Sequence, residues 1–191
     1  TDDYFNAIYQ GQETAYNGKT NGARFVGYYD DANNGRSFSR YMAAISGGGH
    51  AVKNIFPQYN EATGAVDVLT LSKVTYGEAK TEDKDTTVVK EVIEKIDLTP
   101  YESELDQDND GRIDNVTIIM QADEDVKGSG GFEPTLRSHK LSLLDTYTWT
   151  DTSKSTNTFN MLNSNVLSGK RAGLIAHEYL HSLGYPDLYL P

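Results

Sequence analysis

Apolar positions recur at helical spacing in the segment from Thr86 to about Ile96. The residues between them are mostly Lys and Glu, so one face of such a helix is apolar and the other is charged. This pattern predicts an amphipathic helix that packs on a sheet. Residues 65–71 and 116–120 are instead short apolar runs, which predict strands. The second run is apolar enough for the middle of a covered sheet.

A helix is predicted between Ser37, which is suited to cap it, and Ile45, after which consecutive glycines stop it. An apolar stripe resumes beyond the glycines and predicts a second short helix; its members are Val52, Ile55 and Phe56. Upstream, residues 24–29 are rich in β-forming residues and precede a turn at 30–35, which predicts a strand. Residues 3–22 are polar with spaced glycines and predict a short helix or turn, followed by a loop.

Three polar segments are expected to be loops. Residues 76–85 are charged and without period, residues 128–131 are rich in glycine, and residues 146–165 are dense in Ser, Thr and Asn. The last helix is expected to begin near Ser168. Strands and helices therefore alternate, so the predicted fold class is α/β, with residues 1–191 forming one domain.

Composition restricts the classes of partner and of metal site. The chain has 28 acidic and 17 basic residues and a formal net charge of −11, so nucleic-acid binding is not expected. The absence of cysteine excludes disulfide bonds, thiolate zinc sites and a cysteine nucleophile, so a metal must be held by His, carboxylate or carbonyl ligands. No apolar run approaches the roughly 18 residues needed to cross a bilayer, so no membrane span is expected.

A His-Glu-x-x-His motif at residues 177–181 carries the clearest chemistry. On a helix, His177 and His181 lie one turn apart on the same face, so both imidazoles can bind one zinc ion. Glu178 lies to the side, where its carboxylate can take a proton from a water molecule at the zinc without being a ligand. By chance the motif should arise in well under ~1% of such chains.

A catalytic zinc usually has three protein ligands, and the sequence nominates Asp187 as the third. Gly184 stands where the helix would end in the left-handed conformation, and the reversed chain could bring a side chain three residues later under the metal. Pro186 would help to fix that return. A ligand farther downstream is the alternative.

A second cation site is predicted in the acidic segment that precedes residues 116–120. Acidic residues stand at positions 1, 3, 5 and 9 with Gly111 at position 6, which is the spacing of an oxygen-lined calcium loop. Thr117 replaces the usual Glu at position 12, so the loop is incomplete and a bound calcium would be structural. The alternative is an acidic turn without an ion. The predicted ligands are Asp106, Asp108, Asp110, Arg112 through its carbonyl oxygen, and Asp114.

These motifs resemble those of a known family. The segment 172–189 looks like the catalytic helix of the immune inhibitor A family of zinc metallopeptidases, which are metzincin-like zincins. Residues 108–116 and 138–140 match the family's order and rough spacing, so the resemblance covers roughly residues 86–190. It implies a zincin-like catalytic domain: a twisted mixed sheet with packed helices, a C-terminal active-site helix and an edge strand that pairs with an extended peptide. Residues 128–140 are the candidates near that edge.

The resemblance implies a zinc-dependent endopeptidase of bacterial type, secreted or held in the cell envelope, that hydrolyses peptide bonds in a protein or peptide substrate. Metzincin-like proteases continue past the zinc helix into a lower subdomain. We expect that portion to lie outside these residues, either cut away, on another chain or lost in a degenerate protein. The alternative function is an inactive remnant or a calcium-stabilised peptide-binding module that keeps the zinc helix. His139 is either a group near the substrate or the outer part of the site, or a surface or strand-end residue.

Overall fold

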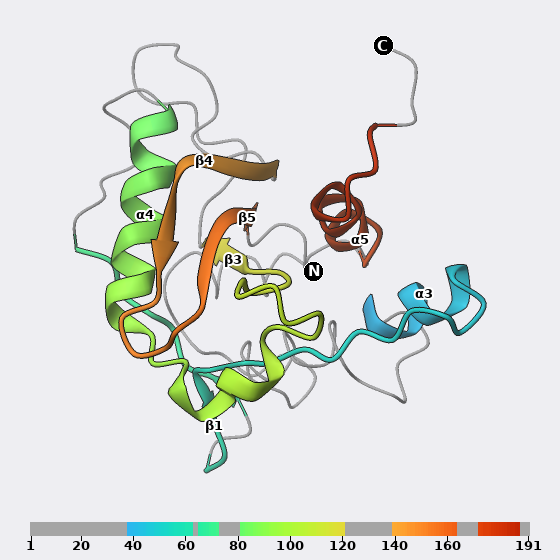
Figure 1. Ribbon diagram of the computed structural model, residues 1–191, viewed down its shortest axis with the longest axis horizontal. Helices are drawn as coiled ribbons and strands as arrows, with labels where there is room; N and C mark the ends of the chain where they lie inside the picture. The colour runs from blue at the N-terminus through green and yellow to red at the C-terminus, as the bar shows by residue number, and fades with distance from the viewer. Residues whose placement is uncertain (1–37, 63–64, 73–80, 121–138, 164–171, 188–191) are drawn as a thin grey trace, which may run out of the picture.

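The computed structural model describes residues 38–62, 65–72, 81–120, 139–163 and 172–187. This part of the chain is a mixed α/β structure, built on a three-stranded mixed sheet (Figure 1). The central strand is β5 (Ser155–Asn163), which pairs in parallel with β3 (Thr117–Met120) and antiparallel with β4 (His139–Thr148). The predicted α/β fold class is confirmed.

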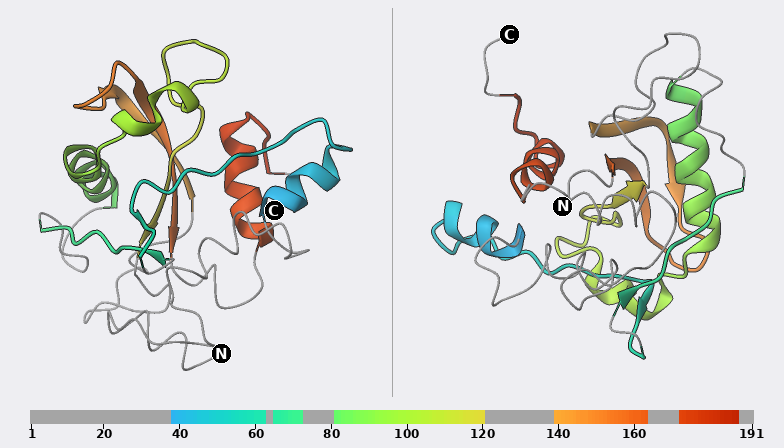
Figure 2. Two further views of the ribbon diagram at one scale, coloured as in Figure 1. Left: turned by 90° about the horizontal axis from the view of Figure 1, so that it is seen from below. Right: turned by 180° about the vertical axis from the view of Figure 1, so that it is seen from behind.

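Helix α4 (Thr81–Lys95) covers one face of the sheet (Figures 1 and 2). Val88, Val89 and Ile93 are buried because the apolar stripe of this helix faces the strands. They share a core with residues that follow α4 and with the strands: Leu98, Leu105, Ile113, Ile118, Trp149, Phe159 and Met161. Burial of each large apolar side chain contributes about 1.5–3 kcal/mol, so this cluster holds α4 on the sheet. The predicted amphipathic helix is confirmed.

Helices α5 (Ala172–Ser182) and α3 (Phe38–Ile45) lie side by side on the opposite face of the sheet (Figure 2). A second apolar cluster joins them to the central strand; its buried members are Phe38, Met42, Leu162, Ile175 and Ala176. Leu162 comes from β5, so the cluster fixes α5 against the sheet. The predicted last helix is present, and its expected start near Ser168 lies outside the described residues.

The prediction of a loop over residues 146–165 is wrong, because the segment contains the end of β4 and all of β5. Phe159 and Met161 enter the core beneath α4, whereas Leu162 enters the cluster beneath α5. The strand is therefore buried on both faces. Burial between two helical layers outweighs the weak strand preference of its Asn and Ser residues, which had suggested a loop.

The helix predicted to end near residue 45 is confirmed, and glycines 47 and 48 follow it at φ values of 61° and 83°. The second short helix is wrong, because residues 51–56 contain no helix. Pro57 disfavours helical backbone at Phe56. The apolar side chains of this segment instead reach two clusters, with Ile55 on the α4 core and Phe56 on the α5 cluster.

The strand predicted over residues 65–71 is short. Only β2 (Ala65–Val66) pairs, in an antiparallel ladder with β1 (Tyr59–Asn60). The chain beyond it is attached to α4 by side chains: Glu91, which is fully buried, accepts hydrogen bonds from the backbone N–H and hydroxyl of Ser72. The backbone N–H of Asp67 still donates to the carbonyl of Gln58 at 2.9 Å, and side-chain contacts take the place of a strand ladder in the residues that follow.

Three other features differ from the predictions or were not among them. α4 begins at Thr81, inside the segment 76–85 that was expected to be loop. β3 lies at an edge of the described sheet rather than in its middle. A 3₁₀ helix, η1 (Thr99–Glu104), follows α4. The predictions for residues 3–22, 24–35 and 128–131 lie outside the described residues. Among the described helices, none is both long and apolar enough to span a bilayer.

Candidate metal centre

Two histidines of α5 face each other. His177 and His181 are one helical turn apart, and their Nε2 atoms are 3.1 Å apart. Their rings meet edge to face, with centroids 4.4 Å apart. Ile175 and Ala176 are buried against the sheet and α3, which turns the histidine face of the helix toward the partly exposed side. The i, i+4 spacing thus brings the two imidazoles to one point, as the motif predicts.

Asp187 approaches the same point from beyond the helix. Its Oδ1 atom is 3.2 Å from Nε2 of His177 and 3.2 Å from Nε2 of His181. In a tetrahedral zinc site with bonds of about 2.0–2.1 Å, two ligand atoms stand about 3.3 Å apart. The three donor atoms therefore fit one face of a tetrahedral zinc site.

The end of α5 explains how Asp187 reaches the histidines. Gly184 has a φ of 90°, the left-handed conformation that only glycine adopts cheaply. The N–H of Gly184 donates to the carbonyl of His181 at 3.0 Å, and the N–H of Tyr185 donates to that of Leu180 at 3.0 Å. The left-handed glycine predicted from the sequence is confirmed, and it reverses the chain toward the face of α5 that carries the two histidines.

A hydrogen bond orients the second histidine. Nδ1 of His181 lies 2.8 Å from the carbonyl oxygen of Tyr185. A carbonyl oxygen only accepts hydrogen bonds, so Nδ1 carries the proton and the neutral ring keeps its lone pair on Nε2. That lone pair is on the nitrogen that faces His177 and Asp187. Such an outer contact fixes both the tautomer and the ring orientation of a metal-binding histidine.

Glu178 is only 4% exposed. One of its carboxylate oxygens lies within 4.8 Å of a ring nitrogen of His177 and of His181. A carboxylate at that separation is near enough to take a proton from a water molecule that lies between it and the histidines. The structure therefore brings together all four residues that the sequence nominated for the zinc site.

The opposite side of α5 packs on α3 and on the chain that follows it. The hydroxyl of Tyr179 is 2.8 Å from Nε2 of His50, and its ring meets Phe38 edge to face, with centroids 5.1 Å apart. Burial raises the pKa of the Tyr179 phenol, and the charge of Asp114 raises it further. His50 thus contacts the side of α5 opposite the two histidines, a position that the sequence did not single out.

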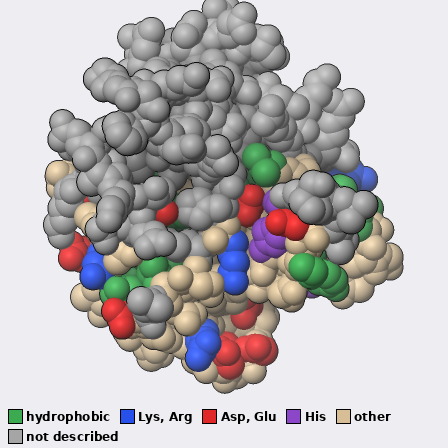
Figure 3. Space-filling model, turned by 90° about the horizontal axis from the view of Figure 1, so that it is seen from above, with side chains coloured by type: hydrophobic (Ala, Val, Ile, Leu, Met, Phe, Trp, Pro, Cys, Tyr) green, Lys and Arg blue, Asp and Glu red, His purple; other side chains and the backbone are tan. Residues whose placement is uncertain are grey.

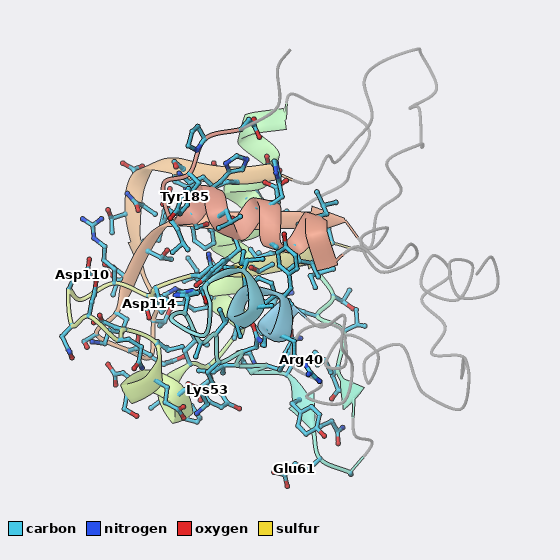
Figure 4. All side chains as sticks on the ribbon, turned by 90° about the vertical axis from the view of Figure 1, so that its right-hand side faces the viewer. Arg40, Lys53, Glu61, Asp110, Asp114 and Tyr185 are labelled. Atoms are coloured by element: carbon cyan, nitrogen blue, oxygen red, sulfur yellow. The ribbon has the colours of Figure 1, made fainter. Side chains whose placement is uncertain are left out.

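In the acidic loop the structure brings together three of the predicted ligands. Carboxylate oxygens of Asp106, Asp108 and Asp114 lie within 4.8 Å of one another. Asp110 is not part of this group, and its Oδ1 atom accepts the backbone N–H of Arg112 at 2.8 Å. Figure 4 shows Asp114 on the side of the loop toward α3 and α5, whereas Asp110 lies at its outer end.

A lysine already neutralises part of this loop. The Nζ atom of Lys154 is 2.7 Å from Oδ2 of Asp106, whose side chain is fully buried. This hydrogen bond lowers the pKa of Asp106 and raises the pKa of Lys154. Burial raises the pKa of Asp114, and the neighbouring carboxylates raise it further. The donor set therefore suits a cation, but an ammonium group occupies one of its oxygens.

The histidine site is open to the surface. The side chains of His177 and Asp187 are 36% and 47% exposed. In Figure 3, histidine and acidic side chains meet on one face of the molecule, next to apolar side chains. Among the large apolar residues that stay exposed, Leu183 and Tyr185 follow α5 directly. A molecule in solution can therefore reach this side of the site.

Comparison with known proteins assigns no family. The chain matches none of the models of known protein families, and no curated protein sequence matches it. The interpretation of the histidine site therefore depends on its geometry and on the chemistry of its donor atoms.

Lys154, Asn160 and Ser182 make side-chain hydrogen bonds that the sequence did not predict: Lys154 with Asp106, and Ser182 with Asn160. Lys154 and Asn160 lie in the segment expected to be loop, and Ser182 looks like an ordinary helix-end residue. Their contacts join residues far apart in the chain, so local sequence carries no signal for them. His139 begins β4, where its backbone pairs with Met161.

Proposed function

We propose that this protein is a zinc-dependent endopeptidase with a zincin-like fold. The observation that supports this most strongly is the triangle of Nε2 of His177, Nε2 of His181 and Oδ1 of Asp187, with sides of 3.1–3.2 Å. Two imidazoles and one carboxylate are a common protein donor set for catalytic zinc, and they leave room for a further ligand. The exposure of the site supports binding of a substrate there.

In this proposal, residues of α5 and of the turn after it have separate roles in peptide hydrolysis. Zinc at such a centre supplies Lewis-acid polarisation of the scissile carbonyl group and makes a water molecule more acidic. Glu178 takes the proton of the attacking water and passes it to the leaving amine, which is the role of a general base and then of a general acid. The Tyr185 carbonyl holds the proton on Nδ1 of His181 and so keeps Nε2 free for the metal.

The arrangement of the strands supports a peptide as substrate. β4 lies at an edge of the described sheet, and α5 contacts both β4 and β5. An edge strand offers backbone N–H and C=O groups that can pair with an extended peptide. In this proposal the peptide lies along β4, near the histidines. We propose a secreted or cell-envelope location for the protein, which its resemblance to exported peptidases supports.

We also propose that calcium binds the acidic loop in a structural role. The convergence of Asp106, Asp108 and Asp114 supports this, because three close carboxylates repel one another and the single charge of Lys154 offsets only part of that repulsion. The loop is attached to the sheet: the N–H of Ile113 donates to the carbonyl of Ser155 at 2.9 Å. A calcium ion there would therefore stabilise the start of β5, the strand whose later residues contact α5.

The test of the zinc centre is Glu178→Gln, made in the full protein with Glu94→Gln as the control. Glu94 is an exposed residue of α4, away from the histidines. We expect Glu178→Gln to keep about one zinc per chain by elemental analysis and to lose about 10²–10⁴-fold in peptide hydrolysis. Hydrolysis at the wild-type rate by Glu178→Gln would disprove the role of Glu178.

Elemental analysis of the wild-type protein, combined with assays of peptide binding and cleavage, separates the two functions that the sequence left open. Stoichiometric zinc with peptide cleavage supports the peptidase. Zinc with peptide binding but no cleavage supports the peptide-binding module instead. If His177→Ala and the wild type contain equally little zinc, the proposed metal centre is wrong.

A further inference from the structure

Asn160 is a polar residue in the buried centre of the sheet. It is 1% exposed and lies on β5 between Phe159 and Met161, which are fully buried. Its side chain is directed to the α5 side, where Oδ1 accepts a hydrogen bond from the hydroxyl of Ser182 at 2.9 Å. A carboxamide so deeply buried is retained without great cost only if its polar atoms have partners.

The other end of the Asn160 amide is also held. Its Nδ2 atom donates to Oδ1 of Asn115 at 3.4 Å, and the hydroxyl of Thr117 donates to the same oxygen at 3.1 Å. The backbone N–H of Asn160 donates to the carbonyl of Val116 at 2.8 Å. Because a carboxamide oxygen only accepts hydrogen bonds, Asn115 turns the NH₂ group of Asn160 toward itself and the oxygen toward α5.

Ser182 lies in the last turn of α5, which carries His181. It is the last residue of the helix and directly follows His181. The next residues make the reversal at Gly184, and Tyr185 returns its carbonyl to Nδ1 of His181. A displacement of this last turn therefore moves His181 and Asp187 together, relative to His177 one turn earlier.

We propose that Asn160 is a positioning residue of the metal centre, acting through Ser182 on the last turn of α5. This inference rests on the proposed zinc function. Asn160 lies on β5, the central strand, which is buried on both faces, so the hydrogen bond attaches the helix end to the middle of the described sheet. Tyr179 and Leu180 also pack on the apolar cluster near the end of α5, but apolar contacts are non-directional. The hydrogen bond of Ser182 adds a directional contact, which fixes where the last turn lies along the strand.

The experiment compares Ser182→Ala with Ser39→Ala in the full protein. Ser39 is a matched control, because its hydroxyl oxygen accepts a hydrogen bond from the Asn54 side chain at 2.7 Å, on the helix that packs against α5. Zinc affinity is measured by competition with a chelator, coordination by the absorption spectrum of the Co²⁺-substituted protein, and stability by Tm. Ser182→Thr, which keeps the hydroxyl, is the conservative variant.

We expect Ser182→Ala to weaken zinc binding by up to about 10-fold and to alter the Co²⁺ spectrum. This is the lower end of the effect of losing a direct contact to a metal ligand, because Ser182 acts on His181 through the backbone. Ser39→Ala should lower Tm to a similar extent while it leaves both metal readouts unchanged. Ser182→Thr should recover most of the affinity. In a double-mutant cycle with Asn160→Leu, adding Ser182→Ala should cause little further loss, because both changes remove the same contact.

Two results would overturn the inference, and they differ from the failure of the zinc centre itself. If the wild type binds zinc through His177 but Ser182→Ala binds it equally well, only the positioning role is wrong. The same holds if Ser39→Ala weakens zinc binding as much as Ser182→Ala. If the wild type and His177→Ala bind zinc alike, the metal centre is wrong and the positioning role is wrong with it.

Discussion

The ion pair between Lys154 and Asp106 affects how the acidic loop can bind a metal cation. Asp106 has the sequence context of a calcium ligand, yet in the structure its buried carboxylate is held by the ammonium of Lys154 at 2.7 Å. The backbone N–H of Asp110 and that of Gly111 also donate to it, both at 3.0 Å. Removal of the lysine would leave a buried carboxylate without its cation, which is costly. A metal cation that binds this loop must therefore compete with Lys154.

We expect Lys154→Met to lower Tm in the absence of calcium and to make Tm rise more steeply with calcium concentration than in the wild type. Calcium would then supply the positive charge that the lysine supplies now. Differential scanning calorimetry across a calcium series measures both effects. Lys53→Met is the control, because Lys53 is exposed and pairs with Glu104 instead. Equal calcium responses in wild type and Lys154→Met would argue against calcium binding in the loop.

At the scale of an element, the end of α5 depends on one backbone conformation. Gly184 has a φ of 90°, and a Cβ atom added there would meet nothing within 4 Å. A substitution at this position therefore changes backbone strain without a steric clash. Gly173, near the start of the same helix, also has open space around it, but its φ is not in the left-handed region. A comparison of alanine substitutions at these two glycines therefore separates the effect of backbone strain at residue 184 from the effect of replacing a glycine as such.

Gly184→Ala should destabilise the protein by about 1–2 kcal/mol, the cost of left-handed backbone in a residue with a Cβ atom. It should also weaken zinc binding, because relief of the strain moves Asp187 away from the histidines. Gly173→Ala should leave zinc binding unchanged and raise stability by up to about 1 kcal/mol. Urea unfolding and zinc titration test both variants. A Gly184→Ala protein with unchanged zinc affinity would show that the turn does not place Asp187.

At the scale of the whole molecule, polar contacts join segments that are far apart in sequence. The backbone N–H and the hydroxyl of Ser153, in the turn between β4 and β5, both donate to Oε1 of Glu102 in η1, at 2.8 Å and 2.7 Å. These hydrogen bonds lower the pKa of Glu102. A carboxyl whose pKa is lowered on folding stabilises the folded state above its unfolded pKa, and this contribution is lost as pH falls through the folded value.

The stability of the wild type should therefore fall on acidification below the ordinary glutamate pKa of about 4.3, in part because Glu102 becomes protonated. Glu102→Gln should lower Tm at pH 7 and reduce the dependence of Tm on pH in this acidic range. Glu61→Gln, an exposed glutamate that follows β1, is the control and should leave the dependence unchanged. Parallel Tm profiles for wild type and Glu102→Gln between pH 3 and 7 would contradict this role of Glu102.

The sequence by itself determined the features that depend on local spacing. The period of Val88, Val89 and Ile93 indicated α4, and the four-residue step from His177 to His181 indicated that both imidazoles meet on one face of a helix. Gly184 indicated the reversal after α5. Each of these follows from the geometry of a single helix or turn, which neighbouring residues specify without the rest of the chain.

Only the tertiary structure decided the features that depend on burial between layers. A polar run of Ser, Thr and Asn became the central strand because α4 and α5 cover its two faces. Burial gave Asn160 its partner Ser182, 22 residues away, and gave Asp106 its partner Lys154, 48 residues away. Buried polar groups must find partners wherever the fold brings them, and distance along the sequence does not predict which partner that is.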